Sequence, residues 1–419
     1  MNLGNGHREG LRPVGLSASE VQERLNSLRA EDTDWRNGRS ALHVYWAGDD
    51  VEDIALLAYA SFMNSNALAP SAFPSSQWFE NEILAASLPL WNAPPGAGAL
   101  LTSGGTESIL LAMQAMRQWA REERRAVDRP VILVPRSAHP AYEKAAALLD
   151  LVVRRVGLND DFQVDLEHMR SMVDDEVIAI VGSAPCLPFG TIDPIEQMGV
   201  IAQERDLWLH VDACLGGYLA PFVRRAGCLV PPFDFAIAGV RSLSADLHKY
   251  GYAPKGVSVL AYRDQDDRRR HLFRFSDWPK GGYETGTLYG TRSGGVIAAA
   301  WAVMNYLGEA GYLARAEAIM AARSRLELGL ADLGRFKLFG TQPLGTISFT
   351  CADQDLLNAS IVLESMGWYP SRIADPSGLH MTITPVHATA IDAYLRDLKE
   401  AMARDTEETG LTPGRVMTY

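Results

Sequence analysis

Leu207-Trp208-Leu209-His210-Val211-Asp212 is followed along the chain by Ser244-Ala245-Asp246-Leu247-His248-Lys249-Tyr250. The apolar run before Asp212 predicts a buried parallel strand whose carboxyl end opens toward a crevice. Residues 235–240 (Phe-Ala-Ile-Ala-Gly-Val) predict the next strand, and the polar turn after them brings Lys249 to the same edge of the sheet. A carboxylate and an amine are therefore expected side by side.

The pairing of Asp212 with Lys249 indicates a pyridoxal 5'-phosphate (PLP) site. A lysine amine can hold an aldehyde cofactor as a Schiff base, and a carboxylate can keep the pyridine nitrogen of that cofactor protonated. Either residue alone is weak evidence, because an aspartate after a strand often caps a helix or turn. The two in succession favour the cofactor site.

A third element, Thr102-Ser103-Gly104-Gly105-Thr106-Glu107-Ser108, precedes a helical apolar run. Glycines let the backbone approach an anion, and the first turn of the following helix presents unpaired N–H groups. The segment lacks the lysine of a P-loop and the spacing of a dinucleotide fingerprint, so ATP and NAD fit less well. A capped helix after a glycine turn is the alternative interpretation.

Together with residues 182–185, the stretches 210–217 and 242–256 closely resemble the sphingosine-phosphate lyases. These enzymes belong to the group II PLP-dependent decarboxylase family, which has the fold type I, aspartate-aminotransferase-like architecture. The likeness begins near residues 15–17 and continues toward residues 384–388. It implies an α/β fold with a large, mostly parallel sheet domain and a smaller C-terminal α+β domain.

The resemblance also implies roles for individual residues. Lys249 would hold the cofactor, Asp212 would pair with the ring nitrogen, and His139 would stack on the ring, although His139 could instead cap a helix. The cofactor phosphate would be held by Gly104, Gly105, Thr106 and His248. The implied assembly is a homodimer in which Gly290 and Thr291 reach the phosphate of the partner's cofactor, while the neighbouring Arg292 could instead form an interface salt bridge.

Tyr45 and Lys255 match residues of the substrate pocket in the lyases, but one departure concerns the substrate. The family motif Leu-His-Pro-Asp is replaced by Leu68-Ala69-Pro70-Ser71, so a histidine associated with the substrate phosphate is missing. Losing a cationic donor weakens charge-assisted binding of an anion. The resemblance implies a phosphorylated long-chain base as substrate, but the missing histidine leaves open a different substrate, such as a related β-hydroxy amine.

Fold alone does not identify the reaction. The leading hypothesis is an aldehyde-lyase that splits a β-hydroxy amine into an aldehyde and an amino fragment such as phosphoethanolamine, with Lys249, Tyr45 and Lys255 as candidates for the proton transfers. An amino-acid decarboxylase would use the same cofactor site. A catalytically silent scaffold is the third possibility, which the retention of Lys249 and Asp212 argues against.

Length and periodicity predict the organisation of the chain. The 419 residues, 47% of them hydrophobic, exceed what one compact core organises. We expect an N-terminal arm (residues 1–60), a large PLP-binding domain (61–305) and a small C-terminal domain (306–419). Strands and helices alternate from residue 131 to 181, which indicates a parallel sheet covered by helices. The capping box Ser17-Ala18-Ser19-Glu20 predicts a helix at the start of the arm.

Charge and cysteine content exclude several classes of protein. The net charge of −12 disfavours nucleic acids and anionic membranes as partners. The four cysteines lack CxxC spacing, so neither disulfides nor a zinc ribbon is indicated, and the set His210, Asp212 and Cys214 has no fourth ligand. Residues 1–10 show no apolar core of a signal peptide, and no run suits a membrane-spanning helix. A cytoplasmic enzyme without a metal is expected.

Overall fold

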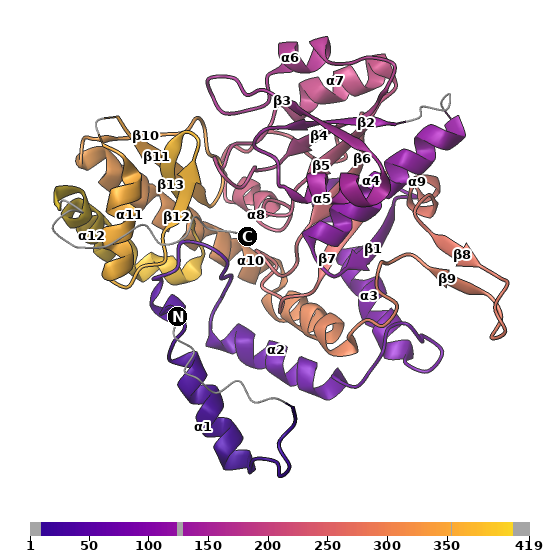
Figure 1. The fold of residues 1–419 in the computed structure, drawn as a ribbon, viewed down its shortest axis with the longest axis horizontal. Helices are drawn as coiled ribbons and strands as arrows, with labels where there is room; N and C mark the ends of the chain where they lie inside the picture. The colour runs from indigo at the N-terminus through magenta and orange to yellow at the C-terminus, as the bar shows by residue number, and fades with distance from the viewer. Residues whose placement is uncertain (1–9, 124–128, 353, 405–419) are drawn as a thin grey trace.

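The computed structural model describes residues 10–123, 129–352 and 354–404. Its centre is a seven-stranded sheet with the order β1-β7-β6-β5-β4-β2-β3 (Figure 1). Six strands run in parallel, and β7 lies antiparallel between β1 and β6. The strands are β1 (Gly98–Thr102), β2 (Val131–Pro135), β3 (Val152–Val156), β4 (Val177–Ser183), β5 (Trp208–Asp212), β6 (Val240–Ala245) and β7 (Ser258–Tyr262).

Helices cover both faces of this sheet. Side chains of β4 and β5 point alternately to two separate apolar clusters, which accounts for their continuous apolar sequence. One cluster contains Trp119 and Trp208 and packs under α4 and α5, and the other extends beneath α7, α8 and α10. The helices are α4 (Gly105–Glu123), α5 (Ala141–Leu149), α6 (Leu166–Ser171), α7 (Ile195–Arg205), α8 (Ala220–Arg225) and α9 (Gln265–Arg269).

A second, four-stranded antiparallel sheet lies beside the first, with the order β10-β11-β13-β12. In Figure 1 it stands at the left, with α11 and α12 beside it. Its elements are β10 (Phe336–Leu338), β11 (Thr346–Cys351), α11 (Leu356–Ser365), β12 (Ser371–Ala374), β13 (Ser377–Thr382), η3 (Pro385–Thr389) and α12 (Ile391–Ala403). The predicted fold class, a large mostly parallel sheet with a smaller α+β part, is confirmed.

The long element α10 (Gly294–Asp332) extends between the two sheets and is broken at Gly308, which has φ 54° and ψ −171°. Before the break, the ring of Trp301 packs against Trp78 of α3 (Pro74–Ser87), and α10 also contacts α2 (Asp49–Phe62). After the break, Arg325 pairs with Asp392 of α12 at 2.7 Å. The second half also contacts the large part of the protein, because Tyr312 stacks on Phe222 of α8 and donates to the Gly251 carbonyl at 3.0 Å.

The N-terminal segment contains α1 (Ala18–Arg29), whose predicted capping box is present: Glu20 N–H donates to Ser17 Oγ, and Ser17 N–H donates to the Glu20 carboxylate. No residue of α1 is buried, and Figure 1 shows the helix extending away from the sheets. The remaining short elements are η1 (Trp35–Asn37), η2 (Leu88–Trp91), and the hairpin of β8 (Phe273–Phe275) and β9 (Tyr283–Thr285).

The strand predicted at residues 235–240 is wrong. This segment forms turns in which Ala236 N–H donates to the Asp234 carboxylate at 3.0 Å, an Asx turn that competes with an extended backbone. The strand next to β5 is β6, which begins where the predicted one ends. Its buried Ser242 receives hydrogen bonds from Trp208 Nε1 at 2.8 Å and also lies 2.8 Å from His210 Nδ1. The serine hydroxyl groups of β6 are polar, so the strand lacks the apolar pattern that predicts a buried strand, although hydrogen bonds in the fold compensate for their burial.

No helix in the described ranges is long and apolar enough to cross a membrane. The expectation that residues 1–10 contain no signal peptide falls almost wholly on residues 1–9, which lie outside the described part of the chain.

Candidate active site

A cavity of about 280 Å³, here called the catalytic cavity, lies where β5 ends. It adjoins a second cavity of about 320 Å³ beside the first turn of α4, here called the phosphate cavity. The two share five lining residues, which are His139, Asp212, Cys214, His248 and Lys249. The predicted amine, carboxylate and glycine-rich segment therefore meet in one place.

Lys249 and Asp246 form a short ion pair on the wall of the phosphate cavity, with Lys249 Nζ 3.0 Å from Asp246 Oδ2. Burial raises the pKa of Asp246, but the charges of Lys249 and His248 outweigh that effect and hold it below its usual value. Burial lowers the pKa of Lys249, whereas Asp246 and the other acidic groups nearby raise it above its usual range. Sequence reasoning did not single out Asp246, although its position three residues before the lysine in a turn was a usable signal.

Asp212 is held in place at the end of β5. Cys214 N–H donates to its Oδ1 at 3.1 Å, and the Ser244 hydroxyl of β6 lies 3.5 Å from the same oxygen. Its side chain remains on the wall of both cavities. A strand-end carboxylate fixed in this way fits the pyridine nitrogen of PLP.

His139 has both of the roles considered from the sequence. Its Nδ1 accepts from Ala141 N–H at 3.1 Å at the start of α5, which is a capping contact. Its ring also lines both cavities, together with Asp212. Burial lowers the pKa of His139, which favours the neutral imidazole. A neutral ring in this position fits a stacking partner for an aromatic cofactor.

The glycine-rich segment fits a phosphate group. Gly105 begins α4, and a Cβ there would stand 2.8 Å from Cys214 Sγ, so only glycine leaves the approach open. Gly104 and Thr106 line the same cavity. His248 Nδ1 is buried and has no hydrogen-bond partner among the described residues. In the tautomer that carries its proton on Nδ1, His248 can donate to an anion, which the N-terminus of α4 also favours.

Tyr45 and Lys255 lie in the catalytic cavity with Lys249. Lys255 as a whole is exposed, but its ammonium lies 4.9 Å from the centre of the Tyr45 ring and donates to the His248 carbonyl at 3.1 Å. Burial of the ammonium and the charge of Lys249 lower the pKa of Lys255 to about 8. The Tyr45 ring packs edge-on against Tyr250, with the ring centres 5.1 Å apart.

Gly290 and Thr291 do not line the catalytic or the phosphate cavity. Thr291 lines a separate cavity of about 200 Å³ and lies 3.4 Å from Asn66 Nδ2. Arg292 forms a double ion pair with Glu80 of the same chain, at 3.1 Å. The cavity that Thr291 lines shares Ser103 and Glu107 with the phosphate cavity, so this segment lies beside the glycine-rich segment without lining the phosphate cavity itself.

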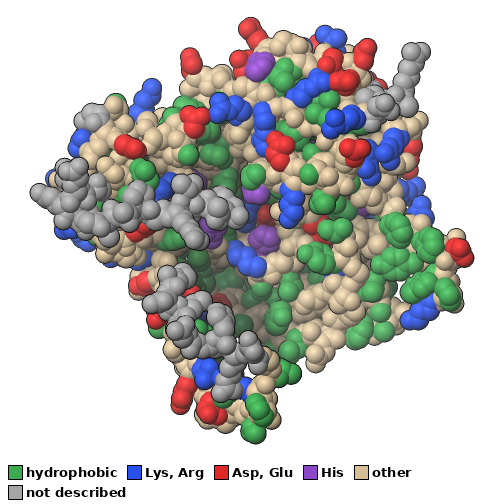
Figure 2. Space-filling model, viewed as in Figure 1, with side chains coloured by type: hydrophobic (Ala, Val, Ile, Leu, Met, Phe, Trp, Pro, Cys, Tyr) green, Lys and Arg blue, Asp and Glu red, His purple; other side chains and the backbone are tan. Residues whose placement is uncertain are grey.

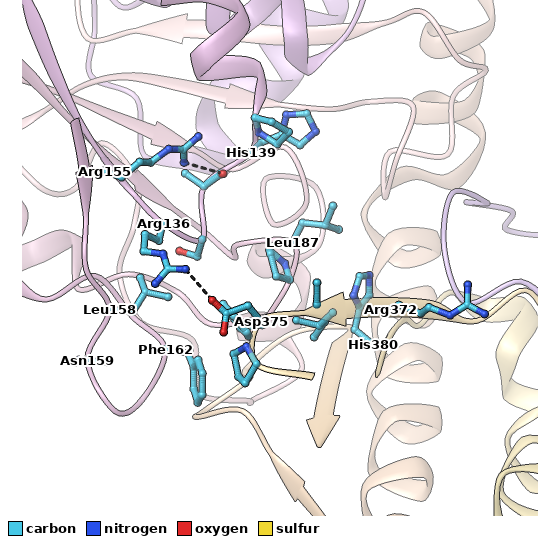
Figure 3. Close-up of a pocket in the computed structure, with 18 of the residues that line it drawn as sticks. Arg136, His139, Arg155, Leu158, Asn159, Phe162, Leu187, Arg372, Asp375 and His380 are labelled. Carbon is cyan, nitrogen blue, oxygen red and sulfur yellow. Dashed lines mark hydrogen bonds and ion pairs between the residues drawn. The ribbon is translucent and has the colours of Figure 1, made fainter. Parts of the chain in front are cut away.

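A larger cleft of about 940 Å³ adjoins the catalytic cavity and shares His139 and Leu187 with it. Figure 3 shows that one wall comes from loops of the large sheet and the other from β12 and β13 of the small sheet. Arg136 and Asp375 reach across from opposite walls and pair at 2.8 Å. Figure 2 shows a hollow on this face, with basic and histidine side chains gathered around it. The cleft is therefore an approach from solvent to the catalytic cavity.

No group of three or more histidine, cysteine or acidic side chains in the described ranges is arranged to hold a metal ion. His210 is fully buried against Ser242, and burial lowers its pKa to about 4.

Comparisons with known proteins agree with this site. Residues 39–352 match the family described as the pyridoxal-dependent decarboxylase conserved domain. The chain is 36% identical to the sphingosine-1-phosphate lyase of Oryza sativa subsp. japonica, over 98% of this chain and 78% of that protein. It is 33% identical to a probable L-tyrosine/L-aspartate decarboxylase of Methanothermobacter thermautotrophicus, over 84% of this chain and 95% of that protein.

Among solved structures, the sphingosine-1-phosphate lyase Bpss2021 of Burkholderia pseudomallei superposes with a TM-score of 0.92 at 36% identity, covering 98% of this chain and 96% of that one. The match extends over both sheets and the segments that form the cavities. The chain therefore belongs to the pyridoxal-dependent decarboxylase family, and its cofactor is pyridoxal 5'-phosphate.

Proposed function

We propose that this PLP-dependent lyase cleaves a carbon–carbon bond in a phosphorylated long-chain base or a related β-hydroxy amine. The products are an aldehyde and an amino fragment such as phosphoethanolamine. The observation that carries the proposal is the position of Tyr45 and the Lys255 ammonium in the same cavity as Lys249 and Asp212. The likeness to sphingosine-1-phosphate lyases over nearly the whole chain supports it.

Each group in the cavity has a chemical task in this proposal. Bound PLP supplies an electron sink for the carbon left after cleavage. In this proposal Lys249 would hold the cofactor, Asp212 would keep its ring nitrogen protonated, and His139 would stack on the ring. Lys255, with a pKa of about 8, is mostly protonated at pH 7 and is suited to bind an anionic group of the substrate, which leaves Tyr45 and Lys249 as candidates to remove the proton of the β-hydroxyl group.

The phosphate cavity accounts for cofactor binding. Gly104, Gly105 and Thr106 open α4 toward it, and the unpaired His248 Nδ1 lies beside them. In this proposal these groups hold the cofactor phosphate. The ion pair with Asp246 would hold the Lys249 amine at the wall of this cavity before the cofactor binds.

We also propose that the enzyme is a homodimer. Gly290 and Thr291 line neither the catalytic nor the phosphate cavity of their own chain, while the adjoining Leu288 and Tyr289 are 61% and 54% exposed. Both features suit a segment that reaches the cofactor phosphate of a partner subunit. Sedimentation of the active enzyme at assay concentration is expected to give a dimer, and an active monomer would contradict the shared site.

The four free cysteines support a reducing, cytoplasmic location.

The test is a product assay with purified protein and PLP. Sphingosine phosphate is supplied, and the aldehyde and phosphoethanolamine are quantified for the wild type, Lys249→Ala and Lys144→Ala, a control lysine exposed on α5. We expect both products from the wild type and the control, and neither from Lys249→Ala. Full turnover by Lys249→Ala would refute the role of this lysine.

A second candidate function is amino-acid decarboxylation. The relative from Methanothermobacter thermautotrophicus favours it, as does Ala69 in place of a histidine expected near a substrate phosphate. Release of carbon dioxide from an amino acid, without aldehyde from sphingosine phosphate, would establish this function instead.

A further inference from the structure

The segment that brings Tyr45 into the catalytic cavity is fixed at both ends. At its start, Thr382 N–H of β13 donates to the Ala41 carbonyl at 2.8 Å, which fastens the segment to the small sheet. At its end, the Tyr45 ring packs against the buried Tyr250. His43 lies between these two attachments and lines the catalytic cavity. Its side chain is therefore held at the cavity wall by the fold.

The backbone of His43 is in an uncommon conformation, with φ 74°. Residues other than glycine enter the left-handed region at a cost in free energy, and such residues concentrate at functional sites where the surroundings enforce them. Here the enforcing contacts are those of Ala41 and Tyr45. The strained position indicates that the imidazole serves a purpose in the cavity.

Basic groups surround His43. Burial, followed by the charges of Lys255 and Lys249, lowers the pKa of His43. His380 on β13 is close enough for the charge of His43 to lower its pKa as well, and its Nδ1 is buried with no partner among the described residues. Among the described residues, the catalytic cavity that His43 lines contains one carboxylate, Asp212, and the neighbouring Asp246 is already paired with Lys249. The lowered pKa values keep both imidazoles neutral near pH 7, and a neutral imidazole can still donate one hydrogen bond to an anion held by the charged Lys255.

We propose that His43 is a specificity-determining residue, which together with Lys255 binds the phosphate monoester of the substrate. In this arrangement His43 supplies the donor that the family motif would place at position 69, where this chain has Ala69. The nature of the substrate rests on the function proposed above, whereas the anion site rests on the cavity itself. Both Lys255 and the imidazole reach the cavity that contains Lys249.

The test compares two changes at His43 in the PLP-loaded enzyme. His43→Gly removes the ring, and glycine adopts a positive φ without strain. His43→Asn tolerates the same backbone conformation and keeps a shorter donor. The control is His168→Asn, a histidine on α6 that lines neither the catalytic cavity nor the cleft. Melting temperatures within a few degrees of the wild type confirm that each variant folds.

Two measurements follow. Calorimetric titration with inorganic phosphate at constant ionic strength gives the Kd of the anion site independently of turnover. The ratio of kcat/KM for sphingosine phosphate to that for the unphosphorylated base gives the specificity. For His43→Gly we expect the Kd to rise and the ratio to fall, each about tenfold, because one hydrogen bond to a charged group is lost. We expect a smaller change for His43→Asn and none for His168→Asn.

The outcomes separate this proposal from the proposed function. A folded His43→Gly enzyme with unchanged phosphate Kd and unchanged specificity overturns the role of His43, even if the lyase reaction is confirmed. A changed Kd in an enzyme that cleaves neither base supports the anion site and refutes the lyase function. A changed Kd with an unchanged ratio in an active lyase overturns the assignment to substrate, because the site then binds only free phosphate.

Discussion

The pKa of Lys255 predicts how activity depends on pH. Burial and the Lys249 charge lower it to about 8, so the ammonium is about 90% protonated at pH 7 and about 10% at pH 9. If the protonated form binds the anionic substrate, kcat/KM falls about tenfold between these two values. Lys255→Arg places a guanidinium in the cavity that stays charged throughout this range. We expect the variant to lose the decline near pH 8.

The assay is a pH profile of kcat/KM for the wild type and Lys255→Arg with sphingosine phosphate, from pH 6.5 to 9.5, in buffers of constant ionic strength. The same profile with the unphosphorylated base is the control, because a substrate without the anion does not require the ammonium for binding. Two results would refute the assignment of the decline in kcat/KM near pH 8 to Lys255. One is a wild-type profile that declines equally for both substrates, and the other is an arginine variant that declines as the wild type does. The decline is expected only because the pKa of Lys255 is lowered, since a lysine at its usual pKa would stay protonated over most of this pH range.

Two further predictions concern buried carboxylates. The Glu107 carboxylate accepts from Leu288 N–H at 2.7 Å and from Ser103 N–H at 2.6 Å, and so joins two loops at the phosphate cavity. Glu107→Gln replaces one of these oxygens by an amide group that cannot accept, and should weaken PLP binding about tenfold in a cofactor titration. An unchanged affinity would show that these loops do not shape the phosphate cavity. Asp267→Ala should lower the free energy of unfolding by about 3 kcal/mol, because it leaves Arg241 without its buried partner, while Asp266→Ala at the exposed neighbouring position should change it by less than about 0.5 kcal/mol in the same denaturant titration.

The meeting of Asp212 with Lys249 was predictable because the carboxyl ends of parallel strands share one edge of a sheet. That inference was correct although the strand before Lys249 was predicted at the wrong residues, because β6 also ends at the edge of the sheet where Asp212 lies. The boundary itself was missed because Ser242 and Ser244 are buried polar residues. Their hydrogen bonds to side chains of β5 exist only once the strands are paired, so no local pattern could reveal them.

The large cleft could not be predicted from the sequence. Its walls combine Arg136, which follows β2, with Asp375, which lies beyond β12. Their approach depends on how the two sheets pack, not on the pattern of either segment. The same holds for His43, whose segment joins the small sheet through the backbone of Ala41. Side chains that depend on such distant packing are visible only in three dimensions.

The kink at Gly308 divides α10 into two helical halves. Its φ of 54° and ψ of −171° belong to a region that glycine alone enters readily, and a Cβ there would meet no atom within 4 Å, so the restriction is purely one of backbone geometry. The halves on either side of Gly308 belong to one continuous core, because Tyr312, just after the break, stacks on Phe222 of α8 and one apolar cluster contains residues of both sheets. A side chain at position 308 would therefore disturb the joint packing of the two sheets through the backbone of α10, although no neighbouring atom would touch it.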